Sequence, residues 1–75
     1  MRYKLFSETK FQEEYGWYRT YGIIAVRRGQ TASVIGDISL DKAKLLPFVK
    51  KLNKEKLELC HLKQVVEEFL YNFEV

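Results

Sequence analysis

The feature that most constrains the fold is a pair of helical apolar stripes in the second half of the chain, over residues 37–70. Apolar residues recur there in two separate runs at the spacing of an amphipathic helix. We expect helices over residues 39–54 and 58–73. Their apolar faces are predicted to form the core, with these members: Leu45, Phe48, Val49, Leu52, Leu62, Val65, Val66, Phe69 and Leu70.

Local residues mark the start of the first helix. We expect Ser39 to be the N-cap, because a hydroxyl accepts hydrogen bonds from the free N–H groups of the first turn. Asp41 then lies in that turn, where a negative charge suits the helix dipole. Pro47 removes a backbone hydrogen bond, so the helix either kinks at this residue or begins near it.

Residues 1–38 carry alternating patterns and turn signals rather than helical spacing. Polar residues at 12–16 and the run Arg28-Gly29-Gln30 predict short turns, which favour an antiparallel meander. We therefore predict one α+β domain over residues 1–75, a three-stranded antiparallel meander followed by two helices packed on one sheet face (βββαα). Gly22, inside the second strand, predicts a bulge or the close approach of another backbone.

Both faces of the predicted sheet carry apolar residues. In the third strand, Ile35 is expected on the opposite side from Val34 and Ile38. The helices can cover only one face, so part of the remaining aromatic surface should be exposed. The second strand supplies residue types that are common at interface hot spots, and we expect these to bind a partner: Trp17, Tyr18, Arg19, Tyr21 and Arg27. The alternative is that these aromatics close the core of a very small domain.

The composition fits a globular domain, with 47% hydrophobic residues, 31% charged residues and a net charge of +3. The apolar runs are too interrupted by charge for a membrane span. The first helix is basic and the second acidic. An alternative function is nucleic-acid binding through the strand aromatics and these lysines of the first helix: Lys44, Lys50, Lys51 and Lys54. The simpler interpretation is that these lysines form a solvent-exposed helix face without a binding role.

Candidates for catalysis or metal binding are few. The pair Cys60-His61 supplies fewer than the three or four ligands of a zinc site. The carboxylate pairs Glu13-Glu14 and Glu67-Glu68 lack the burial that raises a pKa for acid–base chemistry. We therefore expect no enzyme activity, no metal, no cofactor and no small-molecule substrate.

The expected location is the cytoplasm, because the chain has one cysteine and its first residues hold no apolar run like that of a signal peptide.

Several short runs resemble a family of short Firmicutes proteins of unknown function. The matching residues span much of the chain: Tyr21-Gly22-Ile23, Asp37-Ile38-Ser39, Leu45, Val49, Leu52-Asn53, His61-Leu62 and Val65-Val66-Glu67-Glu68-Phe69-Leu70. The chain departs from the family pattern at Glu58-Leu59-Cys60, where a helix-starting residue and a proline are usual, and at Pro47. The resemblance implies a bacterial or phage setting and brings no activity, cofactor or site with it.

The expected function is thus a small non-enzymatic module that binds a protein partner, or a second copy of itself, through its aromatic second strand.

Overall fold

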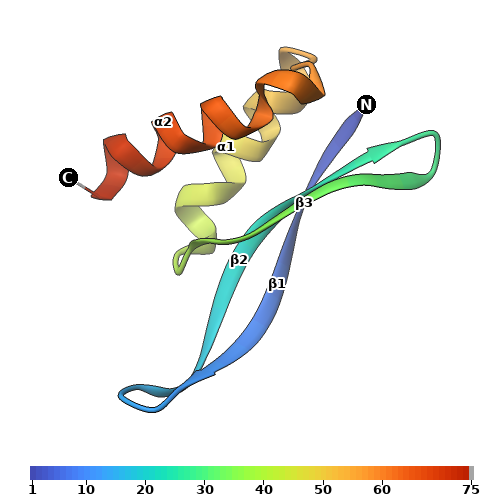
Figure 1. Cartoon of the computed structure of the whole chain (residues 1–75). Helices are drawn as coiled ribbons and strands as arrows, with labels where there is room; N and C mark the ends of the chain where they lie inside the picture. The colour runs from blue at the N-terminus through green and yellow to red at the C-terminus, as the bar shows by residue number, and fades with distance from the viewer. Residues whose placement is uncertain (75) are drawn as a thin grey trace.

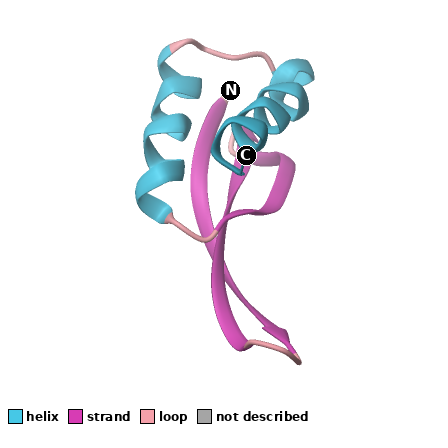
Figure 2. Cartoon of the chain, turned by 90° about the vertical axis from the view of Figure 1, so that its left-hand side faces the viewer, coloured by secondary structure: helices cyan, strands magenta, loops and turns pink. Residues whose placement is uncertain are grey.

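The computed structural model describes the chain over residues 1–74, and its side chains over residues 1–71. Val75, part of the predicted domain, lies outside the described residues. The described elements are β1 (Arg2–Gln12), β2 (Gly16–Arg27), β3 (Gln30–Ser39), α1 (Lys42–Lys54), the 3-10 helix η1 (Leu59–His61) and α2 (Leu62–Glu74). The strands form one antiparallel sheet in the order β1-β2-β3, with both helices on one side of it (Figures 1 and 2). The predicted βββαα architecture is confirmed.

The turn between β1 and β2 sets the register of the first hairpin. The backbone N–H of Tyr15 donates to the carbonyl oxygen of Gln12 at 3.1 Å, and Gly16 follows with φ +74°. Glycine adopts this left-handed conformation without the steric cost that a Cβ would bring. Pairing of Gln12 with Gly16 then places Phe11 directly opposite Trp17.

The pairing of β2 with β3 is irregular near the end of β3. Tyr21 pairs with Ser39, whereas Ile23 pairs with Ile35. Three residues of β3, 36–38, therefore face a single residue of β2, which makes a bulge. The bulge bends β3 away from the lower half of β2, as Figure 1 shows.

Gly22 is the residue of β2 that lies opposite this bulge. A Cβ at Gly22 would overlap the carbonyl oxygen of Ile35, and it would lie 2.8 Å from the Phe6 ring and 2.9 Å from the Cα of Gly36. Real Cβ atoms do not tolerate such distances to backbone. The predicted bulge and close approach at Gly22 are both confirmed.

The bulge also changes which residues of β3 reach the core. Asp37 adopts φ +55°, which breaks the simple alternation of the strand. Ile38 is buried, Ile35 packs against the same core, and Val34 remains 54% exposed. The prediction that Ile35 lies opposite to Val34 is confirmed, but the prediction that it lies opposite to Ile38 is wrong, because the inserted residues bring Ile35 and Ile38 to the same side.

The N-terminus of α1 differs from the prediction. Asp41, not Ser39, is the N-cap: its Oδ1 accepts a hydrogen bond from the Ala43 N–H at 2.9 Å. Ser39 is the last residue of β3, and its Oγ accepts from the Asp41 N–H at 3.0 Å. The helix begins at Lys42 and continues through Pro47, so Pro47 is not its start.

The C-terminus of α1 has the hydrogen-bond pattern of a Schellman motif. The Leu57 N–H donates to the Leu52 carbonyl at 3.1 Å, and the Lys56 N–H donates to the Asn53 carbonyl at 3.2 Å. Lys56 has φ +53°, the left-handed conformation usually taken by glycine at this position. Leu57 packs against the core, so the motif directs the chain back toward the sheet.

The predicted second helix begins with a different geometry. The His61 N–H donates to the Glu58 carbonyl at 3.0 Å, which closes the 3-10 turn of η1, and α2 then continues from Leu62. The predicted start near residue 58 is correct for the turn, while the α-helix proper starts a turn later.

The core lies between the sheet and the two helices. It contains the predicted helix residues Leu45, Val49, Leu52, Leu62, Val66 and Phe69, all buried, with Phe48, Val65 and Leu70 packed around them. The sheet contributes Tyr3, Ile23, Ala25 and Ile38. The rings of Phe48 and Phe69 stack with centroids 4.6 Å apart, which joins α1 to α2. The predicted helix core is confirmed.

Asn53 joins α1 to the edge of the sheet. Its Oδ1 accepts from the Tyr3 N–H at 2.8 Å and its Nδ2 donates to the Tyr3 carbonyl oxygen at 2.8 Å. The Tyr3 hydroxyl donates to the Leu57 carbonyl oxygen at 2.7 Å. Burial of this ring raises the pKa of Tyr3, outweighing the charge of Arg27, which lowers it. The two Asn53 bonds satisfy the outward N–H and C=O of Tyr3, as a neighbouring strand would.

Candidate functional site

The five residues predicted to bind a partner do not lie together. Trp17, Arg19, Tyr21 and Arg27 share the side of β2 that carries Ile23 and Ala25, and the helices bury these last two completely. Tyr18 points to the opposite side. The sequence left open which side of β2 the helices cover, because both faces carry apolar residues, and the structure shows that it is the side of Ile23 and Ala25.

Position along β2 decides which of these side chains are free. Tyr21 is half-buried and packs against the core, so only part of its side chain is accessible to a partner. Arg27 is exposed at the far end of the strand, where it lines a hollow with Met1 and Lys56. Trp17 and Arg19 lie beyond the helices and are exposed, and Tyr18 is half-buried. Only the N-terminal part of β2 therefore presents predicted residues together.

An exposed aromatic cluster lies at the end of the β1–β2 hairpin, which extends away from both helices (Figures 1 and 2). Phe11 is 58% exposed, Tyr15 72% and Trp17 73%. The rings of Phe11 and Trp17 are tilted by 57° with centroids 5.3 Å apart, a favourable aromatic pairing. We call Phe11, Tyr15 and Trp17 the hairpin cluster. Phe11 and Tyr15 were not among the predicted residues, although a three-residue turn between Gln12 and Gly16 would have placed Phe11 beside Trp17.

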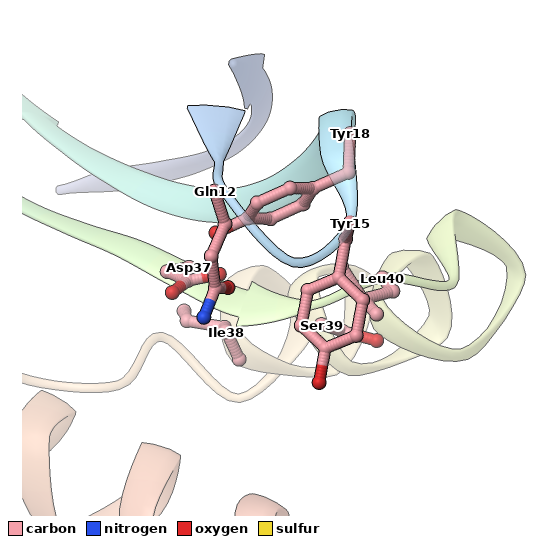
Figure 3. A pocket seen from close by; sticks show the side chains of 7 residues that line it. All are labelled: Gln12, Tyr15, Tyr18, Asp37, Ile38, Ser39 and Leu40. Carbon is pink, nitrogen blue, oxygen red and sulfur yellow. The ribbon is translucent and has the colours of Figure 1, made fainter. Parts of the chain in front are cut away.

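A pocket lies between the hairpin and the end of β3 (Figure 3). Its volume is about 470 Å³, within the range of small-ligand sites. The rings of Tyr15 and Tyr18 form one wall, and the bulged segment of β3 forms the other. Seven residues line it: Gln12, Tyr15, Tyr18, Asp37, Ile38, Ser39 and Leu40. Of these described residues, Asp37 is the only acidic or basic one.

The Asp37 carboxylate is held in place by the bulge. Thr20 is fully buried, and its Oγ1 lies 2.8 Å from Asp37 Oδ1 and 3.2 Å from the Ser39 carbonyl oxygen. The Thr20 hydroxyl donates to one or the other of these acceptors. Asp37 holds a left-handed φ of +55°, which costs about 1 kcal/mol for a non-glycine residue. The adjacent pair Gly36-Asp37 is the sequence signal that could have indicated this interruption of the strand.

The edge of β2 next to this pocket has no strand neighbour over residues 16–19, whereas Thr20 is already buried against β3. Within the described chain, β2 residues 16–20 pair with β1, while pairing with β3 begins only at Tyr21. A strand edge of this kind offers backbone N–H and C=O groups to an incoming extended chain. The pocket and the hairpin cluster share Tyr15, while Trp17 and Tyr18 face opposite sides of the same stretch of β2.

The sheet face opposite the helices is partly apolar. Phe6, Ile24 and Val26 are half-buried there, and Val34 is more exposed. The charged side chains of Lys4 and Glu8, on the same side of β1, interrupt this surface. Its apolar residues are thus less accessible than those of the hairpin cluster.

The four lysines of the nucleic-acid alternative are all exposed on α1: Lys44, Lys50, Lys51 and Lys54. Lys44 and Lys51 line a hollow between the two helices that also contains Glu68. The carboxylate of Glu68 weakens the attraction of this surface for a phosphate backbone. The strand aromatics of that alternative lie on a different element, on the hairpin.

Among the described side chains, one group could hold a metal ion. Ligand atoms of Glu58, Cys60 and His61 all lie within 4.8 Å of one another, and the three residues are exposed. The Cys60 thiol donates a long hydrogen bond to Glu58 Oε2 at 3.8 Å. The predicted ligand pair was Cys60-His61 alone, and the 3-10 turn of η1 brings Glu58 beside it.

Comparison of the chain with protein-family models, with curated proteins and with solved structures gave no match. The resemblance to short Firmicutes proteins therefore stays a prediction. Among the described residues, no helix is long and apolar enough to cross a membrane.

Proposed function

We propose that this chain is a non-enzymatic protein-interaction module that binds a partner protein through the end of its β1–β2 hairpin. The observation that supports the proposal is the hairpin cluster, a group of large aromatic side chains exposed beyond the helices. Tyrosine and tryptophan are enriched among residues that dominate binding energy, since they bury much area at little entropic cost. The unpaired edge of β2 and the pocket, which Tyr15 also lines, lie at the same end of the hairpin as the cluster.

Photo-crosslinking identifies the partner. A photoreactive phenylalanine analogue replaces Trp17, and cross-linked proteins from cells of the source organism are identified and purified. The same analogue at Tyr71, an equally exposed aromatic residue of α2, is the matched control. The proposal requires a partner that cross-links at position 17 and not at position 71.

Affinity measurements with the purified partner then test the hairpin cluster. Trp17→Ala is expected to weaken binding by tenfold to thirtyfold, roughly the effect of losing a hot-spot residue. Tyr71→Ala should change affinity less than about twofold, within the range of neutral positions. Because both residues are exposed, both variants should keep the wild-type circular dichroism. Equal affinity of the wild type and the Trp17→Ala variant would contradict the proposal.

Self-association and nucleic-acid binding are the alternatives to a separate partner. Sedimentation over a range of concentrations tests the homodimer. The exposed lysines of α1 support the nucleic-acid alternative, which predicts retention of DNA or RNA at low salt and its loss in a Lys50→Glu/Lys51→Glu variant. If retention of nucleic acid depends on these lysines and not on Trp17, nucleic-acid binding replaces protein binding as the proposed function.

A further inference from the structure

We propose that the pocket beside the hairpin receives the side chain of an arginine carried on an extended segment of the partner protein, an inference that rests on the proposed function. The bound guanidinium lies between the tyrosine rings and the Asp37 carboxylate. The extended segment runs along the free edge of β2. Three observations support this assignment: the charge of the pocket, the chemistry of its walls and the position of the strand edge.

The charge of the pocket favours a cation. Asp37 is the one charged residue among its seven described lining residues. The bulge fixes the backbone of Asp37, and the buried Thr20 hydroxyl lies 2.8 Å from one carboxylate oxygen. A single carboxylate oxygen accepts more than one hydrogen bond, so the carboxylate remains able to accept from a ligand. A carboxylate positioned in this way pairs best with the planar fork of a guanidinium.

The walls of the pocket distinguish arginine from a fully hydrated cation. Tyr15 and Tyr18 present their rings to the pocket, and Leu40, 69% exposed, lies on its rim (Figure 3). A guanidinium stacks on aromatic faces and is more weakly hydrated than an ammonium group. The aliphatic stem of arginine can pack against Leu40 while its charged end reaches Asp37.

The strand edge explains why the occupant is an extended segment. Residues 16–19 of β2 have a strand neighbour on one side only, and Tyr18 lies in this stretch. A peptide added at this edge makes main-chain hydrogen bonds, and alternate side chains enter neighbouring pockets. The pocket of Tyr18 and Asp37 is then the specificity pocket for one such side chain.

The test uses a short blocked peptide, Thr-Val-Arg-Val-Thr, and the same peptide with neutral citrulline in place of arginine. Binding to the labelled protein is followed by the backbone amide signals in a nitrogen–proton correlation spectrum. The arginine peptide should shift the signals of Tyr18, Asp37 and Ser39 in a saturable way. The citrulline peptide should bind about fivefold more weakly, since an exposed ion pair contributes about that factor.

Two variants separate a specific contact from general electrostatics. Asp37→Asn should weaken the arginine peptide about fivefold and leave the citrulline peptide unchanged, because the charge is lost. Asparagine keeps the acceptor for Thr20 and tolerates the left-handed backbone, so this variant should fold. Glu58→Gln removes a carboxylate outside the pocket and should leave both peptides unchanged.

Four results would overturn the inference: equal binding of the arginine and citrulline peptides, no effect of Asp37→Asn, shifts confined to residues outside the pocket, or tighter binding of a matched lysine peptide. Dimerisation of the wild type that Asp37→Asn abolishes, with no peptide binding, would assign the pocket to a second copy of the chain. Binding of a partner that depends on Trp17 but not on Asp37 would support the proposed function and contradict this inference.

Discussion

Replacing Asn53 by alanine should destabilise the fold more than any ordinary change at a half-exposed helix position. The side chain makes two hydrogen bonds of 2.8 Å to the backbone of Tyr3, one in each direction. Each such bond contributes about 1 kcal/mol, so their loss costs about 2 kcal/mol. Leaving a partly buried backbone group without a partner adds about 1 kcal/mol. The better helix propensity of alanine offsets about 0.6 kcal/mol of this loss in stability.

The expected net loss in the free energy of unfolding is therefore about 2 to 2.5 kcal/mol. In a domain of this size it corresponds to a fall in Tm of roughly 10–15 °C. Urea denaturation followed by circular dichroism measures the change, and the slope with denaturant should stay constant if the denatured state is unaffected. Lys54→Ala, at the next and exposed position of α1, is the control and should change stability by less than about 0.5 kcal/mol.

Hydrogen exchange gives a second and more local readout. The Tyr3 N–H lies on the outer edge of β1 and has Asn53 Oδ1 as its acceptor. Its exchange should become much faster in the Asn53→Ala variant, beyond the change expected from global stability. A loss of less than about 0.5 kcal/mol, within the range of ordinary surface substitutions, together with unchanged exchange of the Tyr3 N–H, would refute the reasoning.

Four further outcomes are expected. Lys56→Gly should stabilise the protein by about 0.5–1 kcal/mol in urea denaturation, because glycine takes the left-handed φ of the Schellman motif without strain; a loss of stability would contradict this. Gly22→Ala should destabilise by about 3 kcal/mol or more, since its Cβ meets backbone, whereas Gly36→Ala should cost much less, because its Cβ meets only the flexible end of Glu8 at 2.6 Å; equal effects would show that the bulge can adjust. The raised pKa of Tyr3 means that the folded state holds this proton more tightly, so its contribution is present below pH 10 and is lost as pH rises through the folded pKa; the wild type should lose more stability above pH 10 than Tyr3→Phe, and parallel profiles would exclude the contribution. The exposed thiol of Cys60 should react fully with a thiol reagent in the native protein, and a need for denaturant would show that it is covered.

The order of the elements and the helix core were predictable from local patterns. The residues of α1 and α2 that the spacing placed on apolar faces are the ones that pack in the core. A helix that buries one face has apolar residues at a helical spacing in its sequence, so the buried face can be predicted from that spacing. The hairpin turn and the irregularity at Gly22 were also predictable, since glycine marks positions where a Cβ would clash or where the backbone turns.

The binding surface was predictable only in part. Trp17 belongs to the hairpin cluster and Tyr18 lines the pocket, but Tyr21 packs against the core and Arg27 lies at the other end of β2. A strand with apolar residues on both sides does not indicate which face the helices will cover, nor how far along the strand they will reach. How far the helices reach depends on their length relative to the hairpin. Which face they cover depends on how the whole chain packs.

The sequence by itself determined the secondary structure, the turns and the apolar faces of the helices, because each depends on residues close together in the chain. The tertiary structure alone decided which side of β2 is buried, the pairing of Asn53 with Tyr3, and the placement of Asp37 opposite Tyr15 and Tyr18. The last of these depends on the bulge in β3, which inserts residues against Gly22 and changes the alternation of the strand. Such contacts join residues far apart in sequence, so no local pattern carries them.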